Sequence, residues 1–354
     1  MPKLDDLLRR LHAAGGSDLH LAAGLAPRMR CDGELRAVDD VPALADAELR
    51  ALLREIAADR HWDQYARSAD VDFAYGLPGV ARFRANYFVQ ENGAAAVFRI
   101  IPEKIVSLDA LALPAAIEGL ARLEQGLVLV TGPTGSGKST TLAAILDRVN
   151  RTLARHVVTI EDPVEFVHSG AQCVFSHREV GRHTQSFGAA LRAAIRQDAD
   201  VVLVGEMRDT ETISLALTAA EMGLLVFGTL HTNGAAKTVD RILDAFGAEE
   251  RPQVRLSLSE SLAAVVSQLL LPAADGKGRV AANEILLRTP GLPNVIREGN
   301  TPMLHSILQS GRSQGMQSMD DALFALVKDG RVLAQDAYLK ATDKARFEPL
   351  LPKD

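Results

Sequence analysis

Residues 132–140 read "GPTGSGKST" and lie between the apolar run 127–130 and a segment with helical spacing. They match the pattern G-x-x-x-x-G-K-[ST], with a strand expected before the loop and a helix after it. In such a loop, glycines let backbone N–H groups converge on phosphate oxygens, and the helix N-terminus adds the positive end of its dipole. The segment therefore predicts binding of a nucleotide with Mg²⁺. The nucleotide-binding residues that we expect are Gly132, Pro133, Thr134, Gly135, Ser136, Gly137, Lys138, Ser139 and Thr140.

The chain around this loop has the rhythm of an α/β domain. Apolar strands that alternate with helical segments are expected at 127–131, 156–161, 201–205 and 225–231. Near-continuous apolar strands of this kind lie in parallel sheets that are covered on both faces. From about residue 255 onward, including the apolar run "LAAVVSQLLLP" at 262–272, we expect mainly helices that form a C-terminal lobe.

Three residues stand where these strands end, at the edge where ligands of parallel sheets bind. Glu206 is expected to position the attacking water, and with Ser139 to serve as a Mg²⁺ ligand. Glu161 suits metal-water ligation or base chemistry, and His231 suits sensing of the γ-phosphate. Each has a structural alternative. Glu206 could cap the following helix, Glu161 could lie in a solvated acidic turn, and His231 could only pack.

Arginines matter because the transition state of phosphoryl transfer spreads negative charge over the transferred group. Candidates are Arg84 and Arg99 in the N-terminal part of the chain, and Arg192, Arg196 and Arg208 in the larger part. Arg192 and Arg196 are four residues apart, which predicts one shared face of a helix. Most arginines are solvated surface residues, so each of these five arginines could also be a surface residue without a role in catalysis.

The first hundred residues indicate a small α+β domain. Asp32-Gly33 lies between two short strand-like runs, which predicts a hairpin, and 72–102 reads as three further strands closed by Pro102. The fold class that we expect is therefore α/β, with a phosphate-loop domain preceded by a smaller α+β domain. The expected limits are 1–102 for the small domain, 103–114 for a linker and 115–354 for the large domain.

Composition narrows the function classes. The chain of 354 residues carries a net charge of -6 and only 5% aromatic residues, which argues against a nucleic-acid motor with a basic, aromatic strand channel. Two cysteines, Cys31 and Cys173, cannot form a four-cysteine zinc site. The N-terminal segment has no signal-peptide core, and the run at 262–272 is too short to span a bilayer. We therefore expect a cytoplasmic protein that can dock on a membrane complex.

Taken together, seven motifs resemble the type IV pilus retraction ATPases, the PilT family of the secretion ATPase superfamily. The resemblance covers about residues 4–335 in unbroken order. The motifs are "SDLHL", "RFRANYF", "GPTGSGKSTTLAAILD", "TIEDPVEFVH", "ALRAAIRQDADVVLVGEMRD", "TAAEMGLLVFGTLHTN" and "NVIREG".

The resemblance implies a PAS-like N-terminal domain and a RecA-like ATPase domain, assembled as a homohexameric ring. It implies an ATP-hydrolysing motor for pilus retraction and twitching motility, bound peripherally to the inner-membrane platform protein of the pilus machine. Glu206 then corresponds to the catalytic glutamate of the Walker B segment, where Gly205 replaces a frequent aspartate. Residues 161–165 correspond to an acidic box and His231 to a histidine box. Arg84 and Arg99 correspond to arginines that reach the γ-phosphate when the two domains close.

Two departures from the family pattern leave alternatives open. Pro293 replaces an arginine in the retraction motif "GLPNVIRE" at 291–298, although proline is tolerated in a first helical turn. His183 replaces a more usual acidic residue. An accessory retraction ATPase that works with a second motor, or a regulatory nucleotide-binding subunit, thus remains an alternative. A pilus-assembly or type II secretion ATPase is less favoured, because those proteins are longer and typically carry a tetracysteine zinc module.

Overall fold

The computed structural model describes residues 4–31, 33–101 and 104–352. Contacts divide the chain into two units. The N-terminal unit holds the residues up to 104 together with Asp162–Val167, and the larger unit holds the rest. Asp32 of the expected hairpin turn, Pro102 and the first linker residue, 103, lie outside the described residues.

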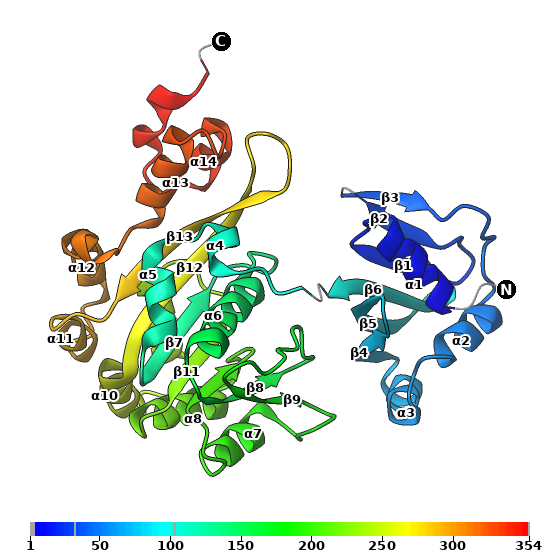
Figure 1. Ribbon diagram of the computed structural model, residues 1–354, viewed down its shortest axis with the longest axis horizontal. Helices are drawn as coiled ribbons and strands as arrows, with labels where there is room; N and C mark the ends of the chain where they lie inside the picture. Colours follow the sequence, from blue (N-terminus) through cyan, green and yellow to red (C-terminus); the bar gives the residue numbers. More distant parts are fainter. Residues whose placement is uncertain (1–3, 32, 102–103, 353–354) are drawn as a thin grey trace. The chain divides into compact units, whose positions relative to one another are not determined.

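The N-terminal unit is an antiparallel sheet with helices on one face (Figure 1). Its strands lie in the order β3-β2-β1-β6-β5-β4. The strands are β1 (Asp18–Ala22), β2 (Arg28–Cys31), β3 (Glu34–Ala37), β4 (Asp70–Leu77), β5 (Ala81–Gln90) and β6 (Gly93–Ile101). The helices are α1 (Leu4–Ala13), α2 (Asp46–Arg54) and α3 (Asp59–Ser68).

The sequence of this unit determines which face of the sheet is covered. In β5, Phe83, Ala85 and Tyr87 are fully buried, while the residues between them are only half-buried. This period of two directs apolar side chains to the face on which the leucines of α1 pack, at helical spacing. The opposite face of the sheet therefore carries polar and charged side chains, among them Arg84.

The larger unit is built on a second sheet, with strand order β13-β12-β7-β11-β10-β8-β9. All neighbouring strands are parallel except β13, which is antiparallel to β12. The strands are β7 (Gly126–Thr131), β8 (His156–Glu161), β9 (Val174–Glu179), β10 (Val201–Val204), β11 (Leu225–Leu230), β12 (Leu262–Pro272) and β13 (Arg279–Leu287).

Helices surround this sheet. They are α4 (Leu108–Leu111), α5 (Ala115–Gly119), α6 (Lys138–Thr152), α7 (Phe187–Ala194), α8 (Thr210–Glu221), α9 (Ala235–Asp244), α10 (Arg251–Ser261), α11 (Leu292–Arg297), α12 (Leu304–Ser310), α13 (Met319–Lys328) and α14 (Ala334–Lys340). Short 3₁₀ turns lie at Leu120–Arg122, Thr301–Met303, Arg312–Gln314, Lys344–Arg346 and Glu348–Leu350.

Both faces of the central strands β7, β10 and β11 are buried, which explains their near-continuous apolar sequences. In β7, Leu127 and Leu129 contribute to the core beneath α7–α12, whereas Val128 and Val130 contribute to the core beneath α5 and α6. Because no face of these strands meets water, polar side chains are concentrated at the strand ends. This arrangement confirms the expected α/β class.

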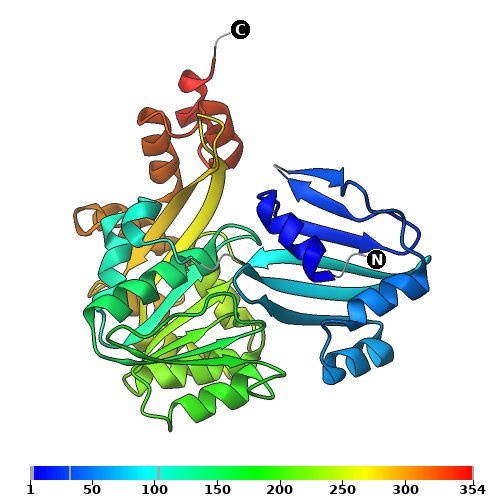
Figure 2. The same ribbon diagram turned by 45° about the vertical axis from the view of Figure 1, so that its right-hand side comes forward.

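The expectation of helices from residue 255 onward is wrong for 262–287. Helix α10 ends at Ser261, and the run 262–272 forms β12, which lies between β13 and β7 in the sheet. A short apolar run fits a buried strand and a buried helix equally well, and the β-branched pair Val265-Val266 favoured the strand. The β12–β13 hairpin extends beyond its neighbours toward α13 and α14 (Figures 1 and 2). The expected helical lobe thus begins only after β13.

Two further expectations concern single helices. Arg192 and Arg196 do not share a helix, because α7 ends at Ala194 and Arg196 lies in the turn that follows. The helix of the motif at 291–298 is intact: α11 has Pro293 in its first turn, where a missing N–H breaks no helical hydrogen bond.

Candidate active site

Four adjacent parallel strands bring the expected catalytic residues to one edge of the larger sheet. In the order β7-β11-β10-β8, the strand ends are followed or closed by the phosphate loop, His231, Glu206 and Glu161. Parallel strands place their carboxyl ends at the same edge, so these side chains come from neighbouring positions. Residues that are up to about a hundred positions apart in sequence thus form one site.

The phosphate loop has the backbone of an anion cradle. Gly132, Gly135 and Gly137 all adopt positive φ, at 141°, 79° and 84°. A Cβ atom at Gly132 would lie 2.3 Å from the carbonyl oxygen of Gln268, so no larger residue fits there. The Lys138 ammonium is buried and donates to the carbonyl oxygens of Gly132 (2.9 Å) and Pro133 (3.2 Å). The lysine is therefore folded back along the loop, within reach of a phosphate.

The polar atoms of the loop also fit the predicted nucleotide. The Ser136 hydroxyl is buried and has no hydrogen-bond partner among the described residues, as expected of a group that contacts a bound phosphate. Ser139 lies in the first turn of α6, and its hydroxyl together with the carboxylates at this edge provides the hard oxygen ligands that Mg²⁺ prefers. Within the described residues, no cluster of three or more His, Cys, Asp and Glu side chains could hold a metal ion.

The carboxylate of Glu206 is held between two side chains, those of Arg208 and His231. One carboxylate oxygen lies 2.7 Å from Nη2 of Arg208, and the other lies 3.0 Å from Nε2 of His231. Burial raises the pKa of Glu206, but the hydrogen bond and charge of Arg208, with a smaller contribution from His231, outweigh it and hold the pKa below its ordinary value. Glu206 is thus ionised at neutral pH. Arg208, expected only as a general candidate, is here a direct partner of the predicted catalytic glutamate.

The backbone around Glu206 requires Gly205. A Cβ atom at this position would lie 3.2 Å from the carbonyl oxygen of Ile160 and 3.3 Å from Cα of Glu161. The Gly205 amide donates to Ile160, and its carbonyl oxygen accepts from the Thr229 hydroxyl. Close packing of the ends of β8, β10 and β11 explains why a glycine replaces aspartate here. Glu161 closes β8 and is buried.

The segment after His231 is fixed by two buried side chains from β12 and β13. The Gly234 amide donates to the Ser267 hydroxyl (3.0 Å), which also contacts the Thr131 hydroxyl (2.6 Å) directly before the phosphate loop. The Ala235 amide donates to Oε1 of Glu284 (2.7 Å). The start of α9 is therefore linked both to the phosphate loop and to β13.

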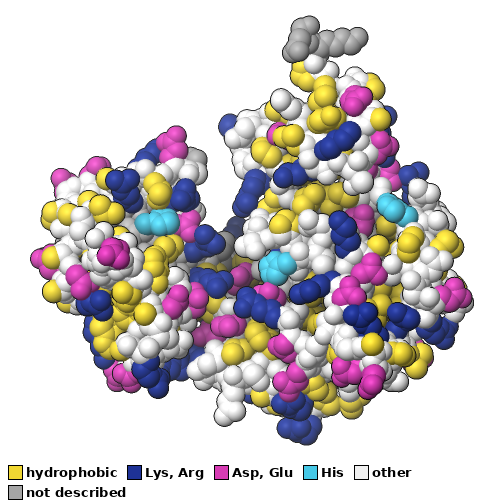
Figure 3. Space-filling view, turned by 180° about the vertical axis from the view of Figure 1, so that it is seen from behind, with side chains coloured by type: hydrophobic (Ala, Val, Ile, Leu, Met, Phe, Trp, Pro, Cys, Tyr) yellow, Lys and Arg dark blue, Asp and Glu magenta, His cyan; other side chains and the backbone are white. Residues whose placement is uncertain are grey.

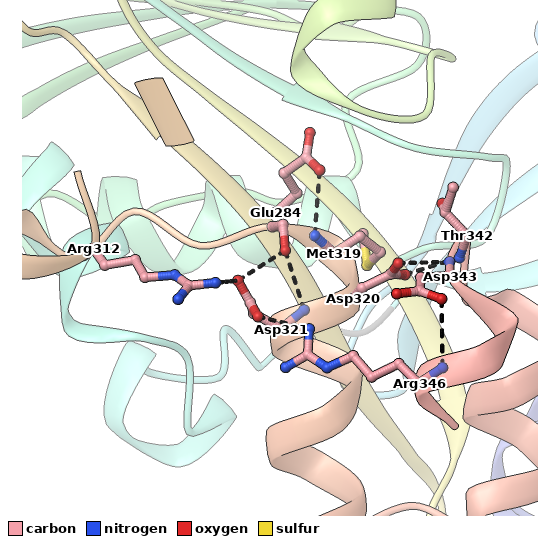
Figure 4. Close-up of polar contacts among 9 residues, drawn as sticks. Glu284, Arg312, Met319, Asp320, Asp321, Thr342, Asp343 and Arg346 are labelled. Carbon is pink, nitrogen blue, oxygen red and sulfur yellow. Dashed lines mark hydrogen bonds and ion pairs between the residues drawn. The ribbon is translucent and has the colours of Figure 1, made fainter. Parts of the chain in front are cut away.

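Glu284 joins two helices that are far apart in sequence, α9 and α13, and Figure 4 shows its contact with Met319 of α13. Its second carboxylate oxygen accepts from the Met319 amide (3.2 Å) at the start of α13. Helix N-termini present unpaired N–H groups and a partial positive charge, so one buried carboxylate suits both. The same region contains a second bridge, in which Asp321 binds Arg312 (2.7 Å) and Arg346 (2.8 Å). Sequence reasoning missed both bridges, because their partners are distant in sequence.

Arg84 and Arg99 lie in the N-terminal unit, directly opposite each other on β5 and β6. Residues paired in this way have side chains on the same face. Nε of Arg99 lies 2.8 Å from the carboxylate of buried Asp18, and Nε of Arg84 lies 3.5 Å from that of Asp72. Asp18 belongs to the motif "SDLHL", but its role beside Arg99 follows only from the pairing of β1 with β6.

The other arginines have separate positions. Arg192 pairs with Glu211 on α8, which accounts for it as a surface contact. Arg279 on β13 was not expected, yet its Nη1 lies 3.5 Å from the carbonyl oxygen of Gly135 in the phosphate loop. His183 accepts a hydrogen bond from the Glu179 amide through Nδ1 (3.0 Å), so it stabilises the turn after β9.

This fold and this site define a nucleoside triphosphatase of the phosphate-loop class. Residues 3–335 match the profile of the type II/IV secretion system protein family, and the chain belongs to that family. It is 50% identical to the type IV pilus retraction ATPase PilT of Pseudomonas aeruginosa, over 97% of this chain and 99% of that protein.

Two further comparisons agree. The chain is 50% identical to a twitching motility protein of Neisseria gonorrhoeae, over 89% of this chain and 84% of that protein. A crystal structure of the pilus retraction motor PilT with bound ADP superposes with a TM-score of 0.90 at 42% identity, covering 99% of this chain and 100% of that one. The expected family and the fold, a RecA-like domain preceded by a smaller domain, are confirmed.

Proposed function

We propose that this chain is an ATP-hydrolysing motor that drives retraction of type IV pili. The observation that carries the proposal is the meeting of the phosphate loop with the Glu206–His231 pair at adjacent strand ends, in a chain that matches a retraction ATPase over nearly its whole length. Figure 3 shows basic and acidic side chains interspersed on the face in view, which suits a protein partner better than nucleic acid.

In this proposal, each of the site residues in the larger unit has a separate role in ATP hydrolysis. Lys138 and the loop amides bind the β- and γ-phosphates, and the Ser139 hydroxyl is a ligand of Mg²⁺. Mg²⁺, when bound, neutralises charge on the phosphate oxygens. Glu206 is ionised and points a carboxylate to the edge where the γ-phosphate would lie, so it orients the attacking water. His231, which contacts Glu206, transmits the state of that carboxylate to α9. Glu161 contributes a second carboxylate to the same edge.

Arg84 and Arg99 supply positive charge from the N-terminal unit in this proposal. The two guanidinium groups stand together on one sheet face, and Asp18 and Asp72 orient them. In this proposal, ATP binds more tightly when the two units are closed on each other, and hydrolysis lets them open again. Repeated ATP hydrolysis then drives movement of the two units. The domain limits 1–102, 103–114 and 115–354 belong to the same proposal.

The assembly in this proposal is a homohexameric ring that works at the cytoplasmic face of the inner membrane. Its partner is the platform protein of the pilus machine. No helix of the described residues is long and apolar enough to cross a bilayer, so attachment in this proposal is peripheral. A second retraction ATPase could share the machine. The change at Pro293 is the one observation that favours an accessory or regulatory role, since it removes a positive charge from α11.

The test is complementation of a strain that lacks its retraction ATPase. The wild-type chain should restore twitching, and Glu206→Gln should not. Restoration only when a second motor is present would favour the accessory role, and restoration by Glu206→Gln would contradict the motor proposal.

A separate variant tests whether the motif 291–298 couples ATP hydrolysis to pilus retraction. In the motif 291–298, Ile296 is fully buried, so Ile296→Ala leaves a cavity and costs roughly 2–5 kcal/mol of folding free energy. Arg297 is exposed, and its guanidinium group donates to the nearby side chain of Asn294. Arg297→Ala should therefore keep ATPase activity and lose twitching. Loss of both activities by Arg297→Ala, with normal folding, would show that the motif does not act in coupling.

A further inference from the structure

The apolar run 262–272 contains two consecutive polar residues that the catalytic scheme does not use. Ser267 and Gln268 lie on β12 beside β7, whose end leads into the phosphate loop. Both are almost completely buried, at 1% and 2% exposure. Burial of a polar side chain costs free energy unless its hydrogen bonds are made, so the contacts of this pair require an explanation.

The carboxamide of Gln268 contacts the phosphate loop and the helix that follows it. Its Nε2 donates to the carbonyl oxygen of Ser136 (2.6 Å). Its Oε1 accepts from the Thr141 hydroxyl (2.8 Å) in the first turn of α6, and from Nδ2 of Asn283 on β13 (3.0 Å). One side chain thus connects the end of the loop, the start of α6 and the neighbouring strand.

Packing around the two outer glycines of the loop supports this role. A Cβ atom at Gly132 would lie 2.3 Å from the carbonyl oxygen of Gln268, and one at Gly137 would lie 2.9 Å from its Nε2. The loop therefore starts against the backbone of Gln268 and ends against its side chain. Its glycines allow this contact as well as the approach of a phosphate.

We propose that Gln268 is a positioning residue for the phosphate loop. It fixes the carbonyl group of Ser136 away from the ligand, so that the loop amides point toward the phosphates. Because Thr141 binds the same carboxamide, the loop and α6 are held in one geometry. Asn283 fixes the carboxamide of Gln268 from the other side. The backbone carbonyl oxygen of Asn283 accepts from Nε2 of Gln317 (2.8 Å), which lies just before α13.

A carboxamide satisfies all of these contacts, whereas an ionised carboxylate or an alkyl side chain does not. The carbonyl oxygen of Ser136 requires a donor, whereas the Thr141 hydroxyl and the Asn283 amide require an acceptor. An ionised glutamate would place an oxygen against the Ser136 carbonyl and a negative charge beside the phosphates. A leucine would leave that carbonyl oxygen unpaired in a buried site.

The test compares Gln268→Glu with a matched change at the other end of α6. Asn150 is equally buried, and its Nδ2 donates to the carbonyl oxygen of Ser169 (2.8 Å) while its Oδ1 accepts from the Ala171 amide (2.9 Å). Asn150→Asp thus makes the same chemical change about one helix length from the loop. Binding of a fluorescent ADP analogue to the full chain gives Kd, and urea unfolding gives the stability of each variant.

We expect Gln268→Glu to weaken nucleotide binding at least ~10-fold, the factor that 1.4 kcal/mol produces. Asn150→Asp should lose similar stability but keep its Kd within about twofold of wild type, a difference of roughly 0.4 kcal/mol. A buried carboxyl group has a raised pKa, and its protonated form can donate to Ser136. The ratio of the Gln268→Glu Kd to the wild-type Kd should therefore fall as the pH is lowered from 8 to 6. Unchanged Kd in folded Gln268→Glu would overturn the proposal, as would equal weakening by Asn150→Asp.

A milder variant covers the case in which Gln268→Glu does not fold. Thr141→Val keeps the shape of the side chain and removes one donor to Gln268. It should weaken binding of the ADP analogue a fewfold, and unchanged binding by this variant would likewise contradict the proposal. The inference rests on nucleotide binding by the loop itself. Wild-type protein that binds no ADP analogue would refute that proposed function, whereas wild-type binding with unaffected Gln268→Glu and Thr141→Val refutes only the role of Gln268.

Discussion

The two sheets of this chain hold their functional charges in different places. In the larger, parallel sheet, strands such as β7 are apolar on both faces, and Lys138, Glu206 and His231 all follow strand ends. In the antiparallel sheet of the N-terminal unit, Arg84 and Arg99 lie in the middle of β5 and β6.

Burial explains the difference. A sheet covered on both faces tolerates charge mainly at its strand ends, or where a buried carboxylate such as Glu284 binds backbone amides. A sheet with one polar face can carry charge at every second residue. The strand-end charges form a compact site around a loop. The mid-strand charges form a row, held by carboxylates such as Asp18. The first arrangement suits binding and chemistry, and the second suits a surface that presents charge to a ligand bound elsewhere.

The largest effect is expected at the strand ends. Lys138→Ala removes the charge that is expected to contact the phosphates, so ATP turnover should fall to background and ATP affinity should drop strongly. Turnover and Kd of the purified chain measure this, with Lys328→Ala on the distant α13 as the control. Wild-type turnover of Lys138→Ala would break the assignment of the loop.

The second-largest effect on activity is expected at Arg84 and Arg99. Arg84→Ala and Arg99→Ala should each reduce kcat by ~10³-fold, as when an arginine is removed from a phosphoryl-transfer site. Arg36→Ala, on β3 of the same sheet and paired only with exposed Glu34, is the control. If the two arginines only support the sheet, the variants will melt earlier and hydrolyse ATP normally, and the two sheets would then not share one function.

A smaller loss is expected at Glu206. Glu206→Gln should bind ATP almost normally and hydrolyse it ~10²-fold more slowly, as after loss of one preorganised catalytic group. The lowered pKa of Glu206 keeps the carboxylate ionised into acidic solution, so activity that depends on it should persist below the ordinary value of 4.5. Arg208→Ala removes the main cause of this lowering.

The pH profile of kcat therefore distinguishes two roles of Arg208. Its acid limb should move to higher pH in Arg208→Ala if the arginine holds Glu206 ionised. An unmoved limb would mean that Arg208 does not control the charge of Glu206.

The smallest effect concerns stability. Burial raises the pKa of Asp18, but hydrogen bonds from Ser17 and Arg99 outweigh it, and the pKa lies below its ordinary value of 3.8. Ionised Asp18 therefore stabilises the fold above that value, and the contribution is lost as the pH falls through the lower, folded-state pKa. Since Arg99 is largely exposed, Asp18→Asn should cost less than ~1 kcal/mol of unfolding free energy at pH 7.

Urea unfolding at pH 7 and below pH 4 measures this contribution, and kcat shows whether Arg99 has lost its orientation. A cost at pH 7 well above that value would mean that Asp18 supports the core and not only the arginine.

The sequence predicts features of this molecule that depend on local patterns. Four of the parallel strands could be identified from their apolar runs. The phosphate loop and the residues at the strand ends could be identified because each directly follows or closes such a run. The strand character of 262–272 could not, since a short apolar run has no decisive period. Gln268, Asp18 and Glu284 were not assigned roles either, because their partners are fixed by strand pairing across the chain. The roles of Glu161, Glu206, His231, Arg84 and Arg99 stay predictions.

The carboxylate of Glu284 has a consequence for the order in which the chain acquires its structure during synthesis. The Ala235 amide, just after the histidine box, pairs with a residue made 49 positions later, and that residue pairs with one made 35 positions later still. Since a chain is made from its N-terminus, the start of α9 has no partner for its first amide until β13 has left the ribosome. A nascent chain that stops before Glu284 would thus contain every residue that is expected to be catalytic and still lack the carboxylate that binds the Ala235 amide.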